Sequence, residues 1–470
     1  MKILLLLPDG VGVRNFIYTD FIDKAIKAGH EIIVWADEDI LSPIDDSRVK
    51  KIKFPAEPFT TSLIEAKRKA WQTGTLKYWA RHFNDNIYLE YIIRPDIGRI
   101  NGVLKPILVK FLLLFNRSGK QLACLKRSYL RRMTELPYFG KCITQLRSIE
   151  PDVILCTHQR ALNAIAPLLA ARALNIRNAC FIYSWDNLPK ATMFVEADHY
   201  LVWSEHMRNE LLQYYPEVKP ENILITGTPQ FIPYFDDSLK KSRERFASEC
   251  GLPADRKWIC YSGGDTRTSP FDPIYLSHLS EAVRDWNRKS ESNLHILFRR
   301  CPVDLSDRFE KVLNANSDIL TPVAPRWGSV NKNAGWDRVV PGKEDVSLLV
   351  NTALHCDMVI NVGSTMAFDF NIFGKPALFI NYNVGNIDNW DVHKIYEFTH
   401  FRSIGSLQPV LWINSRADIP VKIGEAYESL EAVEDCKKWH QKITLHPLEL
   451  ANDRIINALE TISHLCTSVS

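Results

Sequence analysis

Long hydrophobic runs are missing from this sequence. The longest, Ile107–Phe115, is interrupted by Lys110 and is too short to span a bilayer. The apolar run within MKILLLLPDG stops at Pro8 and Asp9, which is typical of a first strand rather than a secretory signal peptide. We therefore expect a soluble cytoplasmic protein, attached at most peripherally to the inner face of the plasma membrane.

Cysteine motifs, a strong net charge and repeats are also absent. The ten cysteines follow no regular spacing and form no CxxC pair, so no zinc site is recognisable and free thiols in a reducing cytosol are favoured. The formal net charge of +3 does not indicate any partner by itself. No short-period repeat or low-complexity tract is present. We expect a globular protein that needs neither a metal nor a cofactor.

The length and the first 36 residues indicate an α/β protein of two domains. A chain of 470 residues is too long for a single core. Residues 2–7 and 31–36 are apolar runs that predict buried strands. Between them, a loop over Pro8–Arg14 and a helix over Asn15–Ala28 are expected. This order is Rossmann-like, although the glycines do not complete the GxGxxG pattern of a dinucleotide site.

Residues 60–149 differ in character from the rest of the first half. Their pattern is helical, they are rich in Trp and Tyr, and Lys and Arg clearly outnumber Asp and Glu. Segments such as 104–115 and 126–133 alternate cationic and apolar residues, which suits an anionic bilayer surface and equally a polyanionic acceptor. Nucleic acid is the poorest of the three candidates, because no nucleic-acid-binding module is recognisable. A solvated helical insertion that covers the sheet is the remaining alternative.

Polar residues gather where further strands of the first domain are expected to end. One predicted strand leads to His158, and the next, Ala179–Tyr183, leads to SWDNLPK at 184–190. Because parallel strands end at one edge of a sheet, this segment places Asp186 at the carboxyl edge. Asp9 follows the first strand in the same way. A strained structural turn is the alternative for SWDNLPK.

Two positions in the second half suit the binding of phosphate. The strand 258–261 is followed by a turn whose glycines let the backbone approach a ligand and whose cation adds a charge-assisted contact. The residues concerned are Gly263, Gly264, Thr266 and Arg267. Arg300 follows the next predicted strand, 294–298, and is of the same kind. A glycine-rich loop without a ligand is the alternative.

One stretch, VINVGSTMAFDFNIFGKPALFIN, organises the second domain. After an apolar strand comes the turn Gly363-Ser364-Thr365, and then a helix expected over Met366–Phe373. The two hydroxyl residues would cap this helix, whose free amide groups attract an anion such as a phosphate. Asp369, one turn further on, is placed to accept hydrogen bonds from a ribose. The alternative is an N-capped helix found in any α/β protein.

An acid five residues before Gly-x-Pro, behind a hydroxyl-bearing turn, resembles the donor-nucleotide motif of the GT-B glycosyltransferases. In that family the acid binds the ribose of a nucleotide sugar, and the turn binds its phosphates. Asp369 stands where most members have Glu. The chain is more similar to bacterial CDP-glycerol-type polymer transferases and related surface-polysaccharide transferases, in which Asp-Phe is common at this place. Their Thr-Phe-Arg turn corresponds to the turn at Arg267, and the resemblance implies that Arg299 or Arg300 meets the diphosphate.

The same resemblance implies which residue acts as the catalytic base. Those transferases carry Trp-His-Gly-Thr-Pro-Leu-Lys where this chain has SWDNLPK, and their His is the proposed base. Asp186 replaces that His, and a carboxylate of suitable pKa performs the same proton transfer. Asp186 is therefore the first candidate for the base, followed by His158 and Asp9.

These observations predict a GT-B fold, with two Rossmann-like domains facing across a cleft. We expect an acceptor domain over residues 1–235, with the helical basic insertion at about 60–149, a donor-nucleotide domain over 236–446, and a terminal helix over 447–470 that packs back on the first domain. Trp336 and Arg338 are available to flank the nucleotide base. The expected activity is metal-independent transfer of a sugar or polyol phosphate from a nucleotide-sugar donor. The acceptor would be a glycan or lipid-linked hydroxyl in cell-surface polysaccharide synthesis.

Two other functions stay open. A UDP-GlcNAc 2-epimerase-like enzyme would share the fold and the acid-before-Gly-x-Pro helix, although the basic insertion and SWDNLPK count against it. The second is a non-catalytic nucleotide-binding or membrane-scaffold protein on the same fold, which would bind a nucleotide without turning over a donor.

Overall fold

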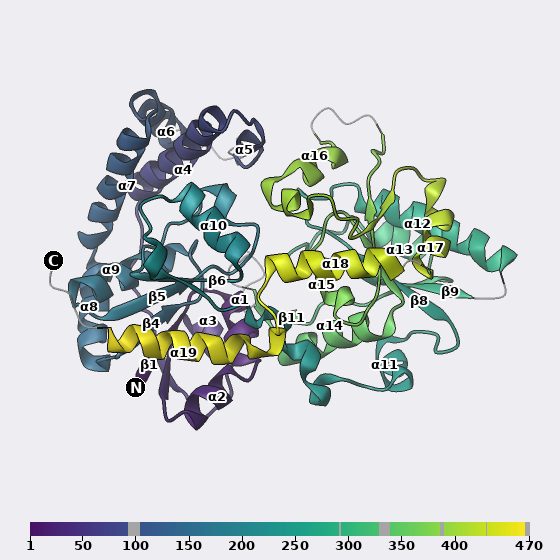
Figure 1. Cartoon of the computed structure of the whole chain (residues 1–470), viewed down its shortest axis with the longest axis horizontal. Helices are drawn as coiled ribbons and strands as arrows, with labels where there is room; N and C mark the ends of the chain where they lie inside the picture. The colour runs from purple at the N-terminus through teal and green to yellow at the C-terminus, as the bar shows by residue number, and fades with distance from the viewer. Residues whose placement is uncertain (93–103, 291–292, 329–338, 386–389, 429, 466–470) are drawn as a thin grey trace. The chain divides into compact units, whose positions relative to one another are not determined.

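The computed structural model describes residues 1–92, 104–290, 293–328, 339–385, 390–428 and 430–465. The chain divides into two compact units (Figure 1). Unit 1 comprises Met1–Pro229 with Thr444–Ser470, and unit 2 comprises Gln230–Ile443. Trp336 and Arg338, which we expected beside the nucleotide base, lie outside the described residues.

Unit 1 is built on a seven-stranded sheet of order β3-β2-β1-β4-β5-β6-β7, in which all neighbouring strands are parallel. The strands are β1 (Lys2–Leu7), β2 (Glu31–Ala36), β3 (Lys50–Lys53), β4 (Val153–Cys156), β5 (Arg177–Phe181), β6 (His199–Val202) and β7 (Ile223–Ile225). In the centre, Leu5 lies opposite Val34 of β2 and Leu155 of β4, and all three are buried. A parallel sheet covered on both faces requires such continuous apolar strands, and the strands predicted at 2–7 and 31–36 are confirmed.

Helices cover this sheet, and the first of them starts earlier than predicted. Outside the insertion they are α1 (Gly10–Gly12), the π-helical η1 (Val13–Ile17), α2 (Phe21–Lys27), α3 (Glu38–Leu41), α9 (Ile165–Ala173), α10 (Glu205–Tyr214) and α19 (Ala451–His464). The Asp9 carboxylate accepts hydrogen bonds from the amides of Val11 (3.1 Å) and Gly12 (3.2 Å). This cap begins a helix directly after β1, so the predicted loop over Pro8–Arg14 is wrong.

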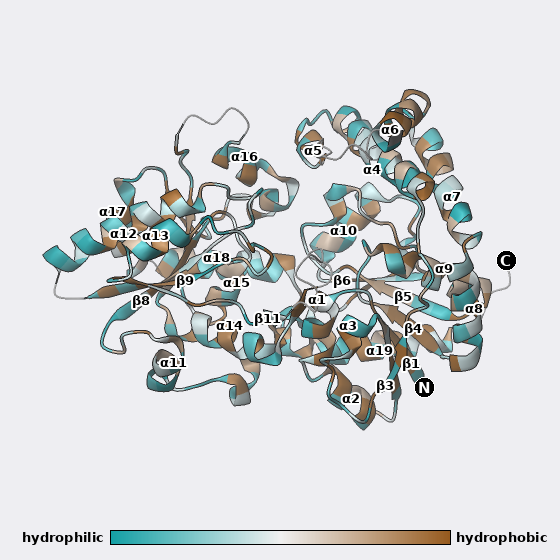
Figure 2. Cartoon of the chain, turned by 180° about the vertical axis from the view of Figure 1, so that it is seen from behind, coloured by the Kyte–Doolittle hydropathy of each residue, from teal (hydrophilic) through white to brown (hydrophobic). Residues whose placement is uncertain are grey.

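The predicted helical insertion is confirmed between β3 and β4. Its described helices are α4 (Ser62–His82), α5 (Ile87–Glu90), α6 (Leu104–Phe115), α7 (Gly119–Thr134) and α8 (Pro137–Ile149). The long α4 packs against α5, α6 and α7. Four large apolar side chains of α6 remain exposed: Ile107, Phe111, Leu114 and Phe115. Figure 2 shows the hydrophobic colouring of this helix. No helix in the described ranges combines the length and the apolar character needed to cross a membrane.

The end of the described chain belongs to unit 1. The amide of Leu445 donates a hydrogen bond to the carbonyl of Trp203 (2.8 Å), and α19 then packs against α2, β4 and β5. Lys24 of α2 forms an ion pair with Asp453 of α19 (2.5 Å). The last segment therefore completes the cover of the first sheet rather than extending unit 2.

Unit 2 contains a second parallel sheet, of order β10-β9-β8-β13-β14-β15. Its strands are β8 (Lys257–Ser262), β9 (Leu294–Arg299), β10 (Leu320–Pro322), β13 (Met358–Asn361), β14 (Ala377–Ile380) and β15 (Leu411–Ile413), beside a small pair β11 (Trp327–Gly328) and β12 (Val340–Pro341). The chain runs from β8 outward to β10, returns to β13 and continues outward to β15. The strand order therefore reverses between β8 and β13, and open α/β sheets bind ligands at such a switch point.

The helices of unit 2 connect these strands. They are α11 (Arg243–Cys250), α12 (Asp272–Lys289), α13 (Glu310–Ala315), α14 (Lys343–His355), α15 (Met366–Asn371), α16 (Val392–Glu397), α17 (Asp418–Ala426) and α18 (Leu430–Ile443). The short α15 packs against α18, where the ring of Phe368 lies 4.8 Å from that of His440. Gly374 after α15 has a positive φ of 66°, as expected for the left-handed residue that ends a helix.

Candidate functional site

Three of the predicted donor-binding segments meet at one edge of the sheet in unit 2. The strands β9, β8 and β13 are parallel neighbours, so their carboxyl ends lie side by side. Arg300 follows β9, Gly263 follows β8 and Gly363 follows β13. The first two are close together, because a Cβ on Gly263 would lie 3.6 Å from the Cα of Arg300. Segments far apart in the sequence thus converge at the switch point.

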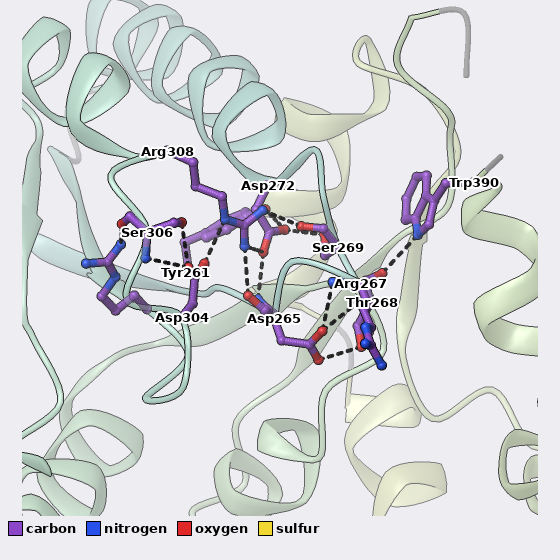
Figure 3. A network of polar contacts seen from close by, with 12 residues as sticks. Tyr261, Asp265, Arg267, Thr268, Ser269, Asp272, Asp304, Ser306, Arg308 and Trp390 are labelled. Atoms are coloured by element: carbon purple, nitrogen blue, oxygen red, sulfur yellow. Dashed lines mark hydrogen bonds and ion pairs between the residues drawn. The ribbon is translucent and has the colours of Figure 1, made fainter. Parts of the chain in front are cut away.

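The turn after β8 is shaped by an acidic residue, as Figure 3 shows. Asp265 accepts hydrogen bonds from the amides of Arg267 (2.8 Å) and Thr268 (3.1 Å) and from the hydroxyl of Thr268 (2.7 Å). This turn leaves Thr266 and Arg267 exposed. An exposed guanidinium at a sheet edge is available to an anion.

The two glycines of this turn have structural roles. The amide of Gly263 donates to the carbonyl of Arg299 (2.9 Å), and the amide of Gly264 donates to the carboxylate of Asp272 (2.6 Å). A Cβ on Gly264 would lie 3.1 Å from the Cβ of Ser269, so a larger residue would crowd the turn. The glycines therefore shape the turn, and their amides are already used inside the protein.

Asp272, the first residue of α12, is the centre of the network in Figure 3. Its buried carboxylate accepts hydrogen bonds from the hydroxyls of Tyr261 (2.7 Å) and Ser269 (2.5 Å). Arg308 lies 3.7 Å from it and donates to the carbonyls of Gly264 (2.9 Å) and Ser269 (2.6 Å). Burial raises the pKa of Asp272 to about 6, although these hydrogen bonds and the charge of Arg308 act to lower it. The network fixes the turn that presents Arg267.

The two arginines after β9 are in different environments. Arg299 is buried and pairs with the carboxylate of Asp345 (2.8 Å), so its guanidinium serves the interior of unit 2. Arg300 is half-buried, donates to the carbonyl of Ser306, and lies over the ring of Phe309 with 5.6 Å to the ring centre. Of the two, Arg300 is the better candidate for contact with a diphosphate.

The turn after β13 depends on Gly363. Its φ is +61°, and a Cβ there would lie 2.9 Å from the ring of Phe401. The hydroxyl of Ser364 accepts a hydrogen bond from the amide of Met366 (3.3 Å), as expected for a cap. Thr365 already has helical backbone angles and its hydroxyl forms no capping hydrogen bond, so the expectation that it caps the helix is wrong.

Asp369 lies in the first turn of α15 and is only 4% exposed. Its neighbour Phe368 stacks on His440, which fixes this helix against α18. The backbone at Asp369 is therefore held in place with the helix. Its hydrogen bond to a ribose remains a prediction.

In unit 1 two of the predicted catalytic residues contact each other. Asp9 follows β1 and His158 follows β4, and these strands are neighbours. The Oδ2 atom of Asp9 contacts Nδ1 of His158, and the two residues are 2% and 3% exposed. Burial acts to raise the pKa of Asp9, but the charge and hydrogen bond of His158 outweigh it and hold the pKa below its usual value. An ionised Asp9 therefore orients the imidazole.

The SWDNLPK segment forms a compact polar turn around Asp186. The carboxylate accepts hydrogen bonds from the hydroxyl of Ser184 (2.6 Å) and the amide side chain of Asn187 (3.0 Å), and it forms an ion pair with Lys190. Its side chain is 25% exposed. Ala191, the next residue, has a left-handed backbone (φ 52°), so the turn is strained as well as polar. Asp186 is thus held firmly and remains accessible.

Two residues around this turn, Arg160 and Glu210, are not recognisable from the sequence. Arg160 donates hydrogen bonds to the amide oxygen of Asn187 (2.9 Å) and the hydroxyl of Tyr183 (3.2 Å). Glu210 of α10 is buried, and its burial, followed by the charge of Asp186, raises its pKa to about 8. Single polar residues of this kind leave no pattern, and only the fold brings them to Asp186.

Two parallel sheets of Rossmann type, each with polar residues at its carboxyl edge, place the protein in the GT-B fold class. The fold is shared by Staphylococcus aureus MnaA in a structure with UDP, at 13% identity over 99% of this chain and 98% of that one, with a TM-score of 0.54.

Two further solved structures share this fold. A UDP-GlcNAc 2-epimerase from Methanocaldococcus jannaschii is 11% identical over 98% of this chain and 100% of that one, with a TM-score of 0.51. A glycosyltransferase from Rickettsia africae is 9% identical over 99% of both chains, with a TM-score of 0.51. No protein-family model and no curated protein matches the chain. At these identities the likeness confirms the predicted fold, and the narrower resemblance to CDP-glycerol-type transferases stays a prediction.

Proposed function

We propose that this protein is a glycosyltransferase that moves a sugar or polyol phosphate from a nucleotide-activated donor to an acceptor hydroxyl. Unit 2 binds the donor and unit 1 supplies the base and the acceptor site. The observation that carries the proposal is the meeting of Gly263, Arg300 and Gly363 at the switch point of the second sheet. Nucleotides bind at this position in open α/β sheets. Proteins of the same fold include one solved with UDP and one named a glycosyltransferase.

The donor site stabilises the leaving nucleotide diphosphate by charge and hydrogen bonds. Arg267 is exposed on a turn that Asp265 and Asp272 hold in shape, and Arg300 lies beside the same turn. These two guanidinium groups supply positive charge where the diphosphate leaves, and Thr365 adds a hydroxyl at the neighbouring strand end. Asp369 then binds the ribose. The proposal requires no metal ion.

Asp186 is the base in this proposal. The acceptor oxygen attacks the donor carbon or phosphorus, the bond to the nucleotide diphosphate or monophosphate breaks, and Asp186 takes the hydroxyl proton. Asp186 is favoured over His158 because a base must touch the acceptor, and their exposures are 25% and 3%. The ammonium group of Lys190 forms an ion pair with this carboxylate and holds it in position. The Asp9–His158 pair is the second candidate.

The test uses Asp186→Asn, which keeps the shape of the side chain. We expect this variant to bind UDP as the wild type does and to lose transfer to the acceptor by several orders of magnitude. Ser248→Ala, an exposed substitution on α11 of unit 2, is the control for effects of preparing and handling a variant. Loss of UDP binding in Asp186→Asn would contradict the division of roles between the units.

Epimerisation is the second candidate, because proteins of this fold include a named UDP-GlcNAc 2-epimerase. An epimerase acts on the donor alone, whereas a transferase needs an acceptor. Incubation with UDP-GlcNAc and no acceptor separates the two. Formation of a 2-epimer would favour the epimerase, and its absence together with acceptor-dependent release of UDP would favour the transferase.

We also propose that the helical insertion lies on an anionic membrane surface and meets a lipid-linked or glycan acceptor there, as in cell-surface polysaccharide synthesis. Support comes from α6, where Phe111 and Leu114 are exposed close to the exposed cations Lys110, Arg117 and Lys120. Apolar side chains enter the boundary of the bilayer while cations contact anionic headgroups.

A further inference from the structure

We infer that unit 1 contains an anion-binding site formed by Arg68 and Arg160, and that the acceptor carries a phosphate group which this site binds. That the bound anion belongs to the acceptor rests on the proposed function. That an anion-binding site exists is argued from the side chains of unit 1 alone.

Arg68 reaches this site from α4, the long helix of the insertion. Its guanidinium lies over the ring of Phe194, with 4.6 Å to the ring centre, and its Nε atom is buried without a hydrogen-bond partner. Burial lowers the pKa of Arg68, and the charge of Arg160 lowers it further. Both arginines are half-buried, so two guanidinium groups repel each other where their contact with water is reduced.

The surrounding groups do not neutralise Arg68. The titratable groups that act on it are Tyr129 and Arg160, and the buried hydroxyl of Tyr129, whose pKa burial raises, has no hydrogen-bond partner among the described residues. Glu196, which also acts on Tyr129, is paired with Lys126 (2.9 Å) and Arg172 (3.4 Å). In the part of the chain that the structure describes, Arg68 forms no ion pair. Arg68 is half-buried with a buried, unpaired Nε atom, and an anionic ligand would provide the counter-charge that it lacks.

The site is connected to the proposed base through direct contacts. The side-chain amide of Gln72 on α4 donates to the carbonyl of Lys190 (3.3 Å), which ties the insertion to the SWDNLPK turn. Arg160 donates to Asn187 (2.9 Å), which in turn donates to Asp186 (3.0 Å). An anion between the two arginines is therefore held close to the residue that would deprotonate the acceptor. This arrangement assigns the phosphate to the acceptor rather than to the donor nucleotide, which binds in unit 2.

A phosphate group fits this set of donors better than a carboxylate. Each planar guanidinium presents parallel N–H groups that bind two oxygens at once, and a phosphate offers enough oxygens for two guanidinium groups and a tyrosine hydroxyl. The acceptor would thus be a phosphate ester, either soluble or the headgroup of a lipid.

The inference is tested with Arg68→Gln and inorganic phosphate, with ionic strength held constant by chloride. The matched control is Arg81→Gln, which removes the same charge from an exposed residue on the same helix. We expect phosphate to raise the melting temperature of the wild type and of Arg81→Gln. In calorimetry, Arg68→Gln should bind phosphate at least about tenfold more weakly than the wild type. We also expect Arg68→Gln without phosphate to melt no lower than the wild type, because it loses a half-buried charge that forms no ion pair among the described residues. Equal responses of the three proteins to phosphate would overturn the inference.

Two further measurements separate the sources of the phosphate and the two proposals. Glycerol phosphate in solution and vesicles containing phosphatidic acid are each tested with the wild type and Arg68→Gln. Dependence on Arg68 for either ligand supports the site, and independence for both refutes it. UDP binding is measured in parallel and should be the same in Arg68→Gln and the wild type. Phosphate binding that depends on Arg68 without any UDP binding would leave the anion site intact and refute the proposed function instead.

Discussion

The substitution Glu210→Gln tests the electrostatics around Asp186. Glu210 is 9% exposed on α10, and its burial and the charge of Asp186 raise its pKa from 4.5 to about 8. At pH 7 the unfolded chain carries an ionised glutamate, whereas the folded protein carries a protonated one. This difference destabilises the folded protein by about 3 kcal/mol at pH 7 and about 1 kcal/mol at pH 5.

The direction of the pH dependence follows from the raised pKa. Because the folded form binds the proton more tightly, the contribution of Glu210 is most favourable below pH 4.5 and is lost as the pH rises toward 8. Glutamine does not titrate, so Glu210→Gln should be more stable than the wild type, and by more at pH 7 than at pH 5. The difference of about 2 kcal/mol corresponds to about 4–8 °C in the melting temperature of unit 1.

The assay is thermal unfolding of the wild type and variants at both pH values. The control is Glu205→Gln on the same helix, whose exposed carboxylate pairs with Arg208 (2.9 Å) and should give a small shift that is equal at both pH values. A shift for Glu210→Gln that is equal at pH 5 and pH 7, or a loss of stability at pH 7, would refute the reasoning.

Three further predictions concern the other segments. Gly363→Ala should destabilise unit 2 by about 1–3 kcal/mol and weaken UDP binding, because the positive φ and the 2.9 Å approach to Phe401 exclude a Cβ; unchanged unfolding in denaturant would contradict this. Arg308→Met should destabilise unit 2 by about 3–5 kcal/mol. The loss should be larger at pH 8 than at pH 5, because Asp272 with its pKa of about 6 is then ionised, and thermal unfolding at the two pH values checks the difference. Phe111→Ser should reduce sedimentation with anionic vesicles several-fold, whereas Leu305→Ser, at a residue of unit 2 that is even more exposed (70% against 56%), should not; equal binding of both variants would argue against a membrane role for α6.

The strands and their order along the chain could be predicted because buried parallel strands are continuous apolar runs. β1 and β13 are examples, and the resemblance around Asp369 indicated the GT-B fold that the second sheet confirms. The start of the first helix could not be predicted as easily. Asp9 caps it directly after β1, although its sequence position is equally typical of a loop.

The contacts between residues that are distant in the sequence could not be predicted, and they make up most of what the structure adds to the site. Asp9 and His158 were both candidates, but their contact depends on β1 and β4 being neighbours, and strand order is not encoded in any local pattern. Asp272 and Arg308 carry no motif, yet they shape the turn that presents Arg267. Arg68 was only one of many cations in the insertion, and its contact with the ring of Phe194 and its unpaired Nε atom set it apart.

The central claim is that unit 2 binds a nucleotide at the edge formed by β8, β9 and β13. Isothermal titration of UDP into the full chain tests it most directly, with Asp369→Asn and Arg267→Gln beside the wild type. We predict one site per chain, with clearly weaker binding in both variants and unchanged binding in Lys289→Gln, an exposed substitution at the C-terminal end of α12. No binding of UDP or of other nucleoside diphosphates to the wild type, or binding that neither variant weakens, would contradict the claim.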